Sequence, residues 1–227
     1  KEGGVSMKKF GLTGNQLKLL AVITMTIDHV GAYLLPEVLW LRIIGRLAFP
    51  IYAYMIAEGC RYTRNRKKYL LRMASLAALC QVVYFFAMQS LYQCILVTFT
   101  LSILLIYAYD TGSRPLTALA LLGVAFVTVA LPRLLPGTDF AIDYGFFGVL
   151  VPVAVYLGKT HREKLLFMAF TLAALAWSFG GIQWYSLAAL LPLALYSGQR
   201  GKRRMKWLFY LYYPLHLAAI YGISLLL

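Results

Sequence analysis

Long, uninterrupted apolar blocks constrain this sequence more than any other feature. Of its 227 residues, 61% are hydrophobic and 13% are charged, whereas an average soluble domain has about 25% charged residues. The blocks are about 15 to 22 residues long, and about 20 helical residues cross a hydrocarbon core of about 30 Å. Most blocks lack the polar face that recurs at every turn of a soluble amphipathic helix. The sequence therefore predicts an all-α, polytopic integral membrane protein.

Nine blocks are predicted to be membrane-spanning helices of a single transmembrane domain, residues 17–227. Residues 1–16 are predicted to form a cytosolic segment, of which residues 1–6 precede Met7 and are either an added remnant or a longer natural start. The first apolar block is too long for a cleavable signal peptide and lacks a small-residue cleavage site. The predicted spans are residues 17–35, 38–60, 69–88, 92–109, 116–131, 144–158, 164–178, 184–196 and 207–227.

Basic residues predict the orientation of these spans, because Lys and Arg near span ends stay in the cytoplasm. With the N-terminus inside, all but three of the 22 Lys and Arg residues fall on the cytoplasmic side. The exceptions are Arg133 in an outer loop, and Arg42 and Arg46 within the second span. The net charge of +14 is therefore interpreted as a membrane-surface charge, and nucleic-acid binding is excluded. We expect the protein in the cytoplasmic (inner) membrane of a bacterium, with the lipid bilayer as its main partner.

Four ionisable residues lie deep inside the predicted spans. At 1.5 Å per residue, they are about 14 to 18 Å from the inner edge of the membrane. Charged groups at this depth are unfavourable and normally face the bundle interior in pairs. Asp28 and His29 point about 100° apart on a helix, so they are expected to face different partners, with Asp28 pairing with Arg46. The four residues are Asp28, His29, Arg46 and His216.

Metal binding is not expected. The chain has only three histidines, and no Asp, His and Cys residues occur at metal-ligand spacing. The three cysteines form no C-x-x-C pair and are interpreted as small buried hydrophobes. They are Cys60, Cys80 and Cys94.

Several motifs of the chain resemble the TraX family in order and spacing, over residues 12–221. The matching segments read "LTGNQLKLLAVITMTIDHVGAYL", "IGRLAFPIYAYMIAEGCRYTRNRKKYLLR", "DYGFFGVL" and "FYLYYPLHLAAIY". The family is named for a conjugation protein that acetylates the N-terminus of F-type pilin. It is similar to a broader superfamily of membrane acyltransferases, in which a basic residue precedes a polar residue, often His, by eleven positions. Lys18 and His29 have that spacing.

The resemblance implies an acyltransferase that takes acetyl-CoA as cosubstrate from the cytoplasm and modifies an acceptor on the outer side. His29 would act as base or acyl carrier, and Arg46 or Tyr213 would stabilise the developing oxyanion. Asp28 would hold Arg46, and His216 would be a second acid/base or a structural partner of His29. The sequence does not identify the acceptor, for which a pilin-like peptide, a glycan and a lipid head group all stay open. The CoA-binding group would comprise Lys18, Glu58, Arg61, Arg64, Arg203 and Arg204.

Two other functions use the same observations. A proton-coupled transporter would also need charged residues at membrane depth and broken helices, although no inverted repeat is visible in the sequence. A non-catalytic membrane assembly protein would need the charged residues only for packing. Without the resemblance, the sequence predicts a polytopic membrane protein with a polar site near its midplane.

Overall fold

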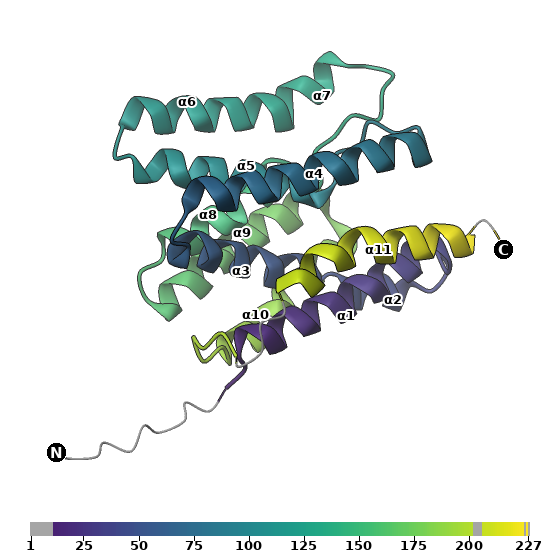
Figure 1. The fold of residues 1–227 in the computed structure, drawn as a ribbon, viewed down its shortest axis with the longest axis horizontal. Coiled ribbons are helices and arrows are strands. Elements are labelled where there is room, and N and C mark those ends of the chain that lie inside the picture. Colours follow the sequence, from purple (N-terminus) through teal and green to yellow (C-terminus); the bar gives the residue numbers. More distant parts are fainter. Residues whose placement is uncertain (1–10, 202–205, 225, 227) are drawn as a thin grey trace.

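The chain folds into a bundle of roughly parallel and antiparallel helices (Figure 1). The computed structural model describes residues 11–201, 206–224 and 226, except for the side chains of residues 206–211. In these ranges the regular structure is entirely helical, apart from two isolated bridges. The helices are α1 (Gly14–Tyr33), α2 (Leu39–Gly45), α3 (Ala48–Tyr62), α4 (Arg66–Met88), α5 (Ile95–Asp110), α6 (Arg114–Ala125), η1 (Phe126–Ala130), α7 (Leu131–Leu134), α8 (Gly145–Leu157), α9 (His161–Phe179), η2 (Gly181–Ala189), α10 (Leu190–Ala194) and α11 (Lys206–Ser224).

The predicted spans correspond to helical segments in the described ranges, so the location of the helices is confirmed. Within the residues that the structure describes, three helical stretches are long and apolar enough to cross a membrane, namely Leu39–Tyr62, Arg66–Met88 and Arg114–Leu134. The apolar helices Ile95–Asp110 and Gly145–Leu157 are shorter. Length and composition together therefore indicate a helical membrane protein.

Side-chain caps begin four helices at one end of the bundle. In α1 and α9 a full capping box is present. The hydroxyl of Thr13 or Thr160 accepts the N–H of Gln16 or Glu163, whose side chain in turn accepts the backbone N–H of the threonine. Such caps satisfy amide groups that a helix start leaves without partners. The residues that cap α1, α4, α6 and α9 are Thr13, Asn65, Ser113 and Thr160.

The loops at this capped end are joined by polar contacts, and we call it the inner end. Arg66 forms an ion pair with Asp110 at 2.6 Å, and Arg61 donates a hydrogen bond to the carbonyl of Gly158 at 2.9 Å. The N–H of Asn15 donates to the carbonyl of Arg200 at 3.0 Å. Figure 1 shows that α1 begins at this end and α11 ends at the opposite, outer end. The basic loops predicted to share one side of the membrane thus lie together.

The second predicted span is broken in two, with α2 ending at Gly45 and α3 beginning at Ala48. Pro50 explains the break. Proline has no N–H to donate to the carbonyl four residues earlier, here that of Arg46, and its ring also clashes with that carbonyl. The break lies at Arg46 itself, which therefore projects from a helix end rather than from a regular helix.

The eighth predicted span is not a regular α-helix. It begins with the 3₁₀ helix η2, followed by the short α10. Gly180 and Gly181 have φ angles of +68° and +51°, a region that favours glycine, and this turn separates η2 from α9. The tighter 3₁₀ segment contacts α9, α3 and α2. Its polar residue Gln183 is only 4% exposed.

The fifth predicted span contains a π-helical turn, η1, between α6 and α7. Pro132, at the start of α7, cannot donate to the carbonyl of Thr128, so the α-helical pattern cannot continue unchanged there. The N–H of Leu131 bonds to the carbonyl of Phe126, five residues earlier, and the hydroxyl of Thr128 donates to the carbonyl of Val124 at 2.7 Å. Figure 1 shows α6 and α7 along one edge of the bundle.

Candidate functional site

Asp28 accepts hydrogen bonds from two arginines. Its Oδ1 lies 2.6 Å from Arg46 Nη2 and its Oδ2 lies 2.9 Å from Arg42 Nη1. Arg42 Nη1 also donates to the Asp28 carbonyl at 3.0 Å. The predicted pairing of Asp28 with Arg46 is confirmed, and Arg42 is an additional partner that the sequence did not predict. One carboxylate shared by two guanidinium groups leaves this cluster with a net positive charge.

Arg46 is the better anchored of the two arginines. Its Nε donates to the Arg42 carbonyl at 3.3 Å, and its Nη1 donates to Gln183 Oε1 at 3.3 Å. Its side chain is 11% exposed, against 28% for Arg42. The Gln183 contact connects the end of α2 to η2. Gln183 Nε2 is buried and has no hydrogen-bond partner within the described part of the chain.

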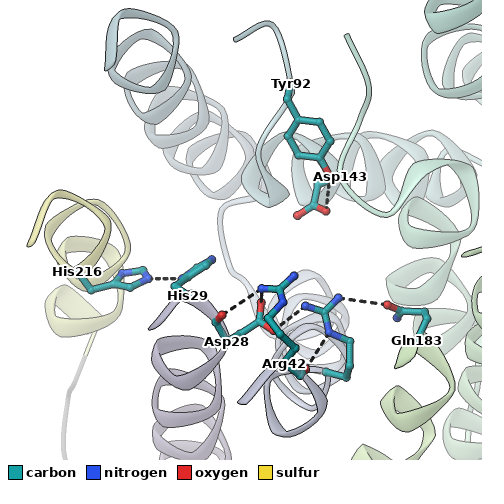
Figure 2. Close-up of polar contacts among 8 residues, drawn as sticks. Asp28, His29, Arg42, Tyr92, Asp143, Gln183 and His216 are labelled. Atoms are coloured by element: carbon teal, nitrogen blue, oxygen red, sulfur yellow. Dashed lines mark hydrogen bonds and ion pairs between the residues drawn. The ribbon is translucent and has the colours of Figure 1, made fainter. Parts of the chain in front are cut away.

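His29 faces away from Asp28 and bonds to α11. Its Nδ1 lies 2.7 Å from Nε2 of His216, and the ring centroids are 4.9 Å apart. Figure 2 shows Asp28 and His29 leaving α1 toward different partners, as their adjacent positions on a helix predict. His216 is only 7% exposed. The structure therefore brings the four predicted midplane residues together as two pairs, Asp28 with Arg46 and His29 with His216.

Asp28, His29, Arg42 and Arg46 line one side of a polar cavity of about 350 Å³. The opposite side carries Asp143, whose Oδ1 accepts a hydrogen bond from the Tyr92 hydroxyl at 2.8 Å. The hydroxyl of Thr98 donates to the Asp143 carbonyl at 2.6 Å and so fixes the loop before α8. Figure 2 shows Tyr92 and Asp143 across from the Arg42 and His29 side chains. The polar residues lining the cavity are Asp28, His29, Tyr33, Arg42, Arg46, Tyr52, Tyr92, Asp143, Tyr144, Gln183 and Tyr213.

A second, mostly apolar cavity of about 200 Å³ lies next to the first. Four residues line both cavities, namely Met25, Tyr52, Ile95 and Tyr213. The second cavity continues toward the inner end, where its lining includes Lys18, Gly59 and Arg200. The two cavities therefore adjoin, with basic residues lining the inner end of one and His29 lining the other.

The residues predicted to bind CoA occupy different environments. Lys18 lines the apolar cavity at the inner end, and Arg64 is exposed. Arg61 donates to the carbonyls of Tyr156 and Gly158, which gives it a structural role between α3 and the end of α8. Arg203 and Arg204 lie outside the described residues.

Glu58 lies elsewhere, in a separate cavity of about 470 Å³ on the inner end. Its Oε1 accepts a hydrogen bond from Lys164 Nζ at 2.6 Å, and both residues are 8% exposed. In the same cavity the Tyr54 hydroxyl lies 3.1 Å from His161 Nδ1. The cavities lined by Lys18 and by Glu58 have no lining residue in common.

Sequence reasoning missed Arg42, Tyr92, Asp143 and Gln183. Asp143 stands directly before an apolar block and opens the segment "DYGFFGVL", so its position was a usable signal. Gln183 follows two glycines and precedes an apolar stretch, and it was assigned no role. Tyr92 had no distinguishing signal among the 17 tyrosines of the chain.

Two known proteins and one family model are similar to this chain. The chain is 25% identical over 238 residues to a probable fimbrial assembly protein FimC, serogroup H1, of Dichelobacter nodosus, an alignment that covers 90% of this chain and 93% of that protein. It is also 60% identical over 38 residues to an uncharacterized protein of Rickettsia prowazekii (strain Madrid E), covering 17% and 15% of the two chains. No solved structure matches. The family model described as TraX protein matches residues 13–224, and the chain belongs to the TraX family.

Proposed function

We propose that this protein is a membrane-embedded acyltransferase that transfers an acetyl group from acetyl-CoA to an amine or hydroxyl acceptor. In this proposal the bundle spans the bacterial inner membrane with its inner end in the cytoplasm. The clustering of the basic loops at that end supports this orientation, since Lys and Arg flank spans on the cytoplasmic side. The acceptor would approach from the outer end.

The observation that carries the proposal is the pair of adjoining cavities. The apolar cavity starts near Lys18 and Arg200 and shares lining residues with the polar cavity at His29. CoA has phosphates that basic side chains bind, and its acyl-bearing arm is long and thin. Such an arm entering at the inner end would bring its thioester toward His29, while the polar cavity receives the acceptor.

The chemistry follows from the groups that line the polar cavity. His29 would take the proton of the acceptor amine or hydroxyl as that group attacks the thioester carbonyl. The carbonyl oxygen becomes negative in the tetrahedral intermediate, the C–S bond then breaks, and CoA leaves as a thiolate that accepts a proton. In the covalent alternative, His29 Nε2 attacks first and the acceptor then removes the acetyl group from it.

The positive side of the cavity would stabilise the intermediate. Preorganised donors directed at a developing oxyanion contribute strongly in a site that excludes water. Arg42 and Arg46 share one carboxylate, and Gln183 has a donor without a partner among the described residues. These groups provide charge and a free N–H on the side of the cavity opposite Asp143.

Acetyl transfer from labelled acetyl-CoA tests the proposal. Purified protein in lipid should bind acetyl-CoA and hydrolyse it or transfer its acetyl group, and His29→Ala should lower turnover by about 10²- to 10⁴-fold. His161→Gln is the matched control, because His161 is the histidine in the separate inner cavity. Equal turnover by His29→Ala and wild type would exclude His29 as base or carrier, and failure to bind acetyl-CoA would exclude the acyltransferase.

The acceptor class follows from the relative rather than from the cavity. The similarity to a protein named as a fimbrial assembly protein favours a pilus subunit over a glycan or a lipid head group. The same name also favours a second candidate function, assembly without catalysis. The His29→Ala variant distinguishes the two functions. A non-catalytic assembly protein should support fimbriation as well with this variant as with wild type, whereas an acyltransferase with this change should no longer modify its acceptor.

A further inference from the structure

The hydrogen bonds around His216 determine which nitrogen of each histidine carries a proton. His216 Nδ1 lies 2.8 Å from the carbonyl oxygen of Tyr212. A carbonyl oxygen only accepts, so this nitrogen must be protonated. In a neutral imidazole the other nitrogen then has a lone pair, and His216 Nε2 is an acceptor.

The same reasoning extends to His29. His29 Nδ1 lies 2.7 Å from His216 Nε2, and because the latter accepts, His29 Nδ1 must donate. His29 Nε2 then has the lone pair. His29 lines the polar cavity, and Figure 2 shows its second ring nitrogen directed away from His216. The basic nitrogen of His29 is therefore the one that a bound acceptor can reach.

We propose that His216 is a positioning residue, which holds His29 in the tautomer that is protonated at Nδ1 and so presents Nε2 to the cavity as base or nucleophile. The catalytic consequence rests on the proposed acyltransferase function. The assignment of the tautomers rests only on the two hydrogen bonds.

Several contacts fix His216 in the orientation that this role requires. The Tyr212 ring stacks on the His216 ring at a centroid distance of 5.0 Å and an interplanar angle of 9°, and the Tyr213 ring packs edge-on at 5.7 Å. The Thr26 hydroxyl donates to the Val22 carbonyl at 2.8 Å, so the Tyr212 hydroxyl, at 2.6 Å, donates to Thr26. Tyr212 thus ties α11 to α1 one turn from the histidine pair.

Proton transfer to His29 strengthens the pair. When Nε2 takes a proton from the acceptor, His29 becomes an imidazolium whose Nδ1–H still points at the lone pair of His216. That hydrogen bond becomes charge-assisted and therefore stronger. The proton of His216 stays on Nδ1 throughout, hydrogen-bonded to the Tyr212 carbonyl. His216 therefore orients and stabilises His29 without exchanging a proton with substrate.

Nitrogen NMR of the intact protein in bilayers tests the tautomers directly. The chain has three histidines, so ¹⁵N-labelled imidazoles give few signals, and His161→Gln removes the one outside the pair. At pH 8, above the ordinary imidazole pKa of about 6.5, we expect both remaining histidines to be protonated at Nδ1 and coupled across a hydrogen bond. His29 protonated at Nε2 would overturn the proposal, whether or not the protein transfers acetyl groups.

Two substitutions test the catalytic consequence. His216→Gln retains a side-chain oxygen that can accept from His29 Nδ1, whereas His216→Leu fills the space without an acceptor. The Leu variant should lose about 10- to 100-fold in kcat with little change in KM for acetyl-CoA, and the Gln variant should recover most of that loss. Equal kcat in folded Gln and Leu variants would show that the acceptor is irrelevant. If wild type shows no turnover of acetyl-CoA, the proposed function is refuted, but the tautomer assignment is not.

Discussion

Gly45 packs directly against the side chain of Asp28. A Cβ atom placed on Gly45 would lie 2.1 Å from Asp28 Oδ1 and 2.2 Å from Asp28 Cβ. This close approach of α2 to α1 positions the Asp28 carboxylate between the two arginines. Small residues at helix contacts allow such an approach in membrane bundles.

Gly45→Ala should therefore displace Asp28 and separate α1 from α2. We expect a loss of about 1 to 3 kcal/mol in the free energy of unfolding, as for other overpacked sites, measured by thermal unfolding in detergent. Gly123→Ala is the control, because a Cβ there meets no atom within 4 Å. That change should be neutral or slightly stabilising. Equal effects at both positions would contradict the packing described here.

The two arginines should differ in their contribution to stability. Arg46→Gln removes an ion pair and the contacts to Gln183 and the Arg42 carbonyl, and should lower the free energy of unfolding by about 3 kcal/mol. Arg42→Gln affects a more exposed group and should lower it by about 1 kcal/mol. Arg133→Gln, at an exposed α7 site, should change it by less than about 0.5 kcal/mol. A larger effect at Arg42 than at Arg46 would be inconsistent with the structure.

Substitutions of Glu58 and Lys164 test whether this buried ion pair stabilises the fold or binds CoA. Each single change, Glu58→Gln or Lys164→Gln, leaves a buried charge without its partner and should cost about 3 to 5 kcal/mol. The double variant should be more stable than the sum of the two single effects predicts. Affinity for acetyl-CoA, measured by calorimetry on folded protein, should stay unchanged in the double variant. A lost affinity there would instead support a role of Glu58 in binding CoA.

Asp139 should make the outer loops sensitive to acid. Its carboxylate accepts hydrogen bonds from the Ser90 hydroxyl and, at 2.9 Å, from the Leu91 N–H, and these bonds lower the pKa of Asp139. A lowered pKa means that the stabilising effect is complete above the ordinary value of about 3.9 and is lost as the pH falls through the lowered one. Hydrogen exchange of the Leu91 amide should accelerate, beyond its intrinsic pH dependence, as the pH falls below the ordinary carboxyl pKa of about 3.9. Asp139→Asn should abolish that excess, and Glu37→Gln should not.

Helix positions were predictable because burial in lipid demands long apolar runs, and the runs in this sequence are well separated. The type of each helix, α or 3₁₀, was harder to predict from the sequence. Hydropathy does not depend on the hydrogen-bonding pattern, so the apolar η2 segment has the same signature in the sequence as an α-helical span. The 3₁₀ geometry of η2 and the positive φ angles of Gly180 and Gly181 before it are visible only in the structure. Pro50 indicated a bend near Arg46, but only the structure shows that the helix stops there.

The pairing of Asp28 with Arg46 was predictable for a physical reason: charged groups at that depth need partners, and counting residues along each helix gave their level. The contact between His29 and His216 was one of two roles left open for His216. The opposite side of the cavity was not predictable in this way. Asp143 belongs to a loop, and its position depends on backbone bonds between Gln93 and the loop and on the hydroxyls of Tyr92 and Thr98. Contacts of this kind between distant loops have no periodic signature in the sequence.

The hydrogen bond between His29 and His216 joins α1 to α11, across 187 positions of the chain. The pair can therefore form only once α11 has packed against α1, so the partner of His29 Nδ1 depends on a contact between helices far apart in the chain. Removal of α11 would leave Asp28 with both of its arginine partners but would leave His29 Nδ1 without the His216 nitrogen.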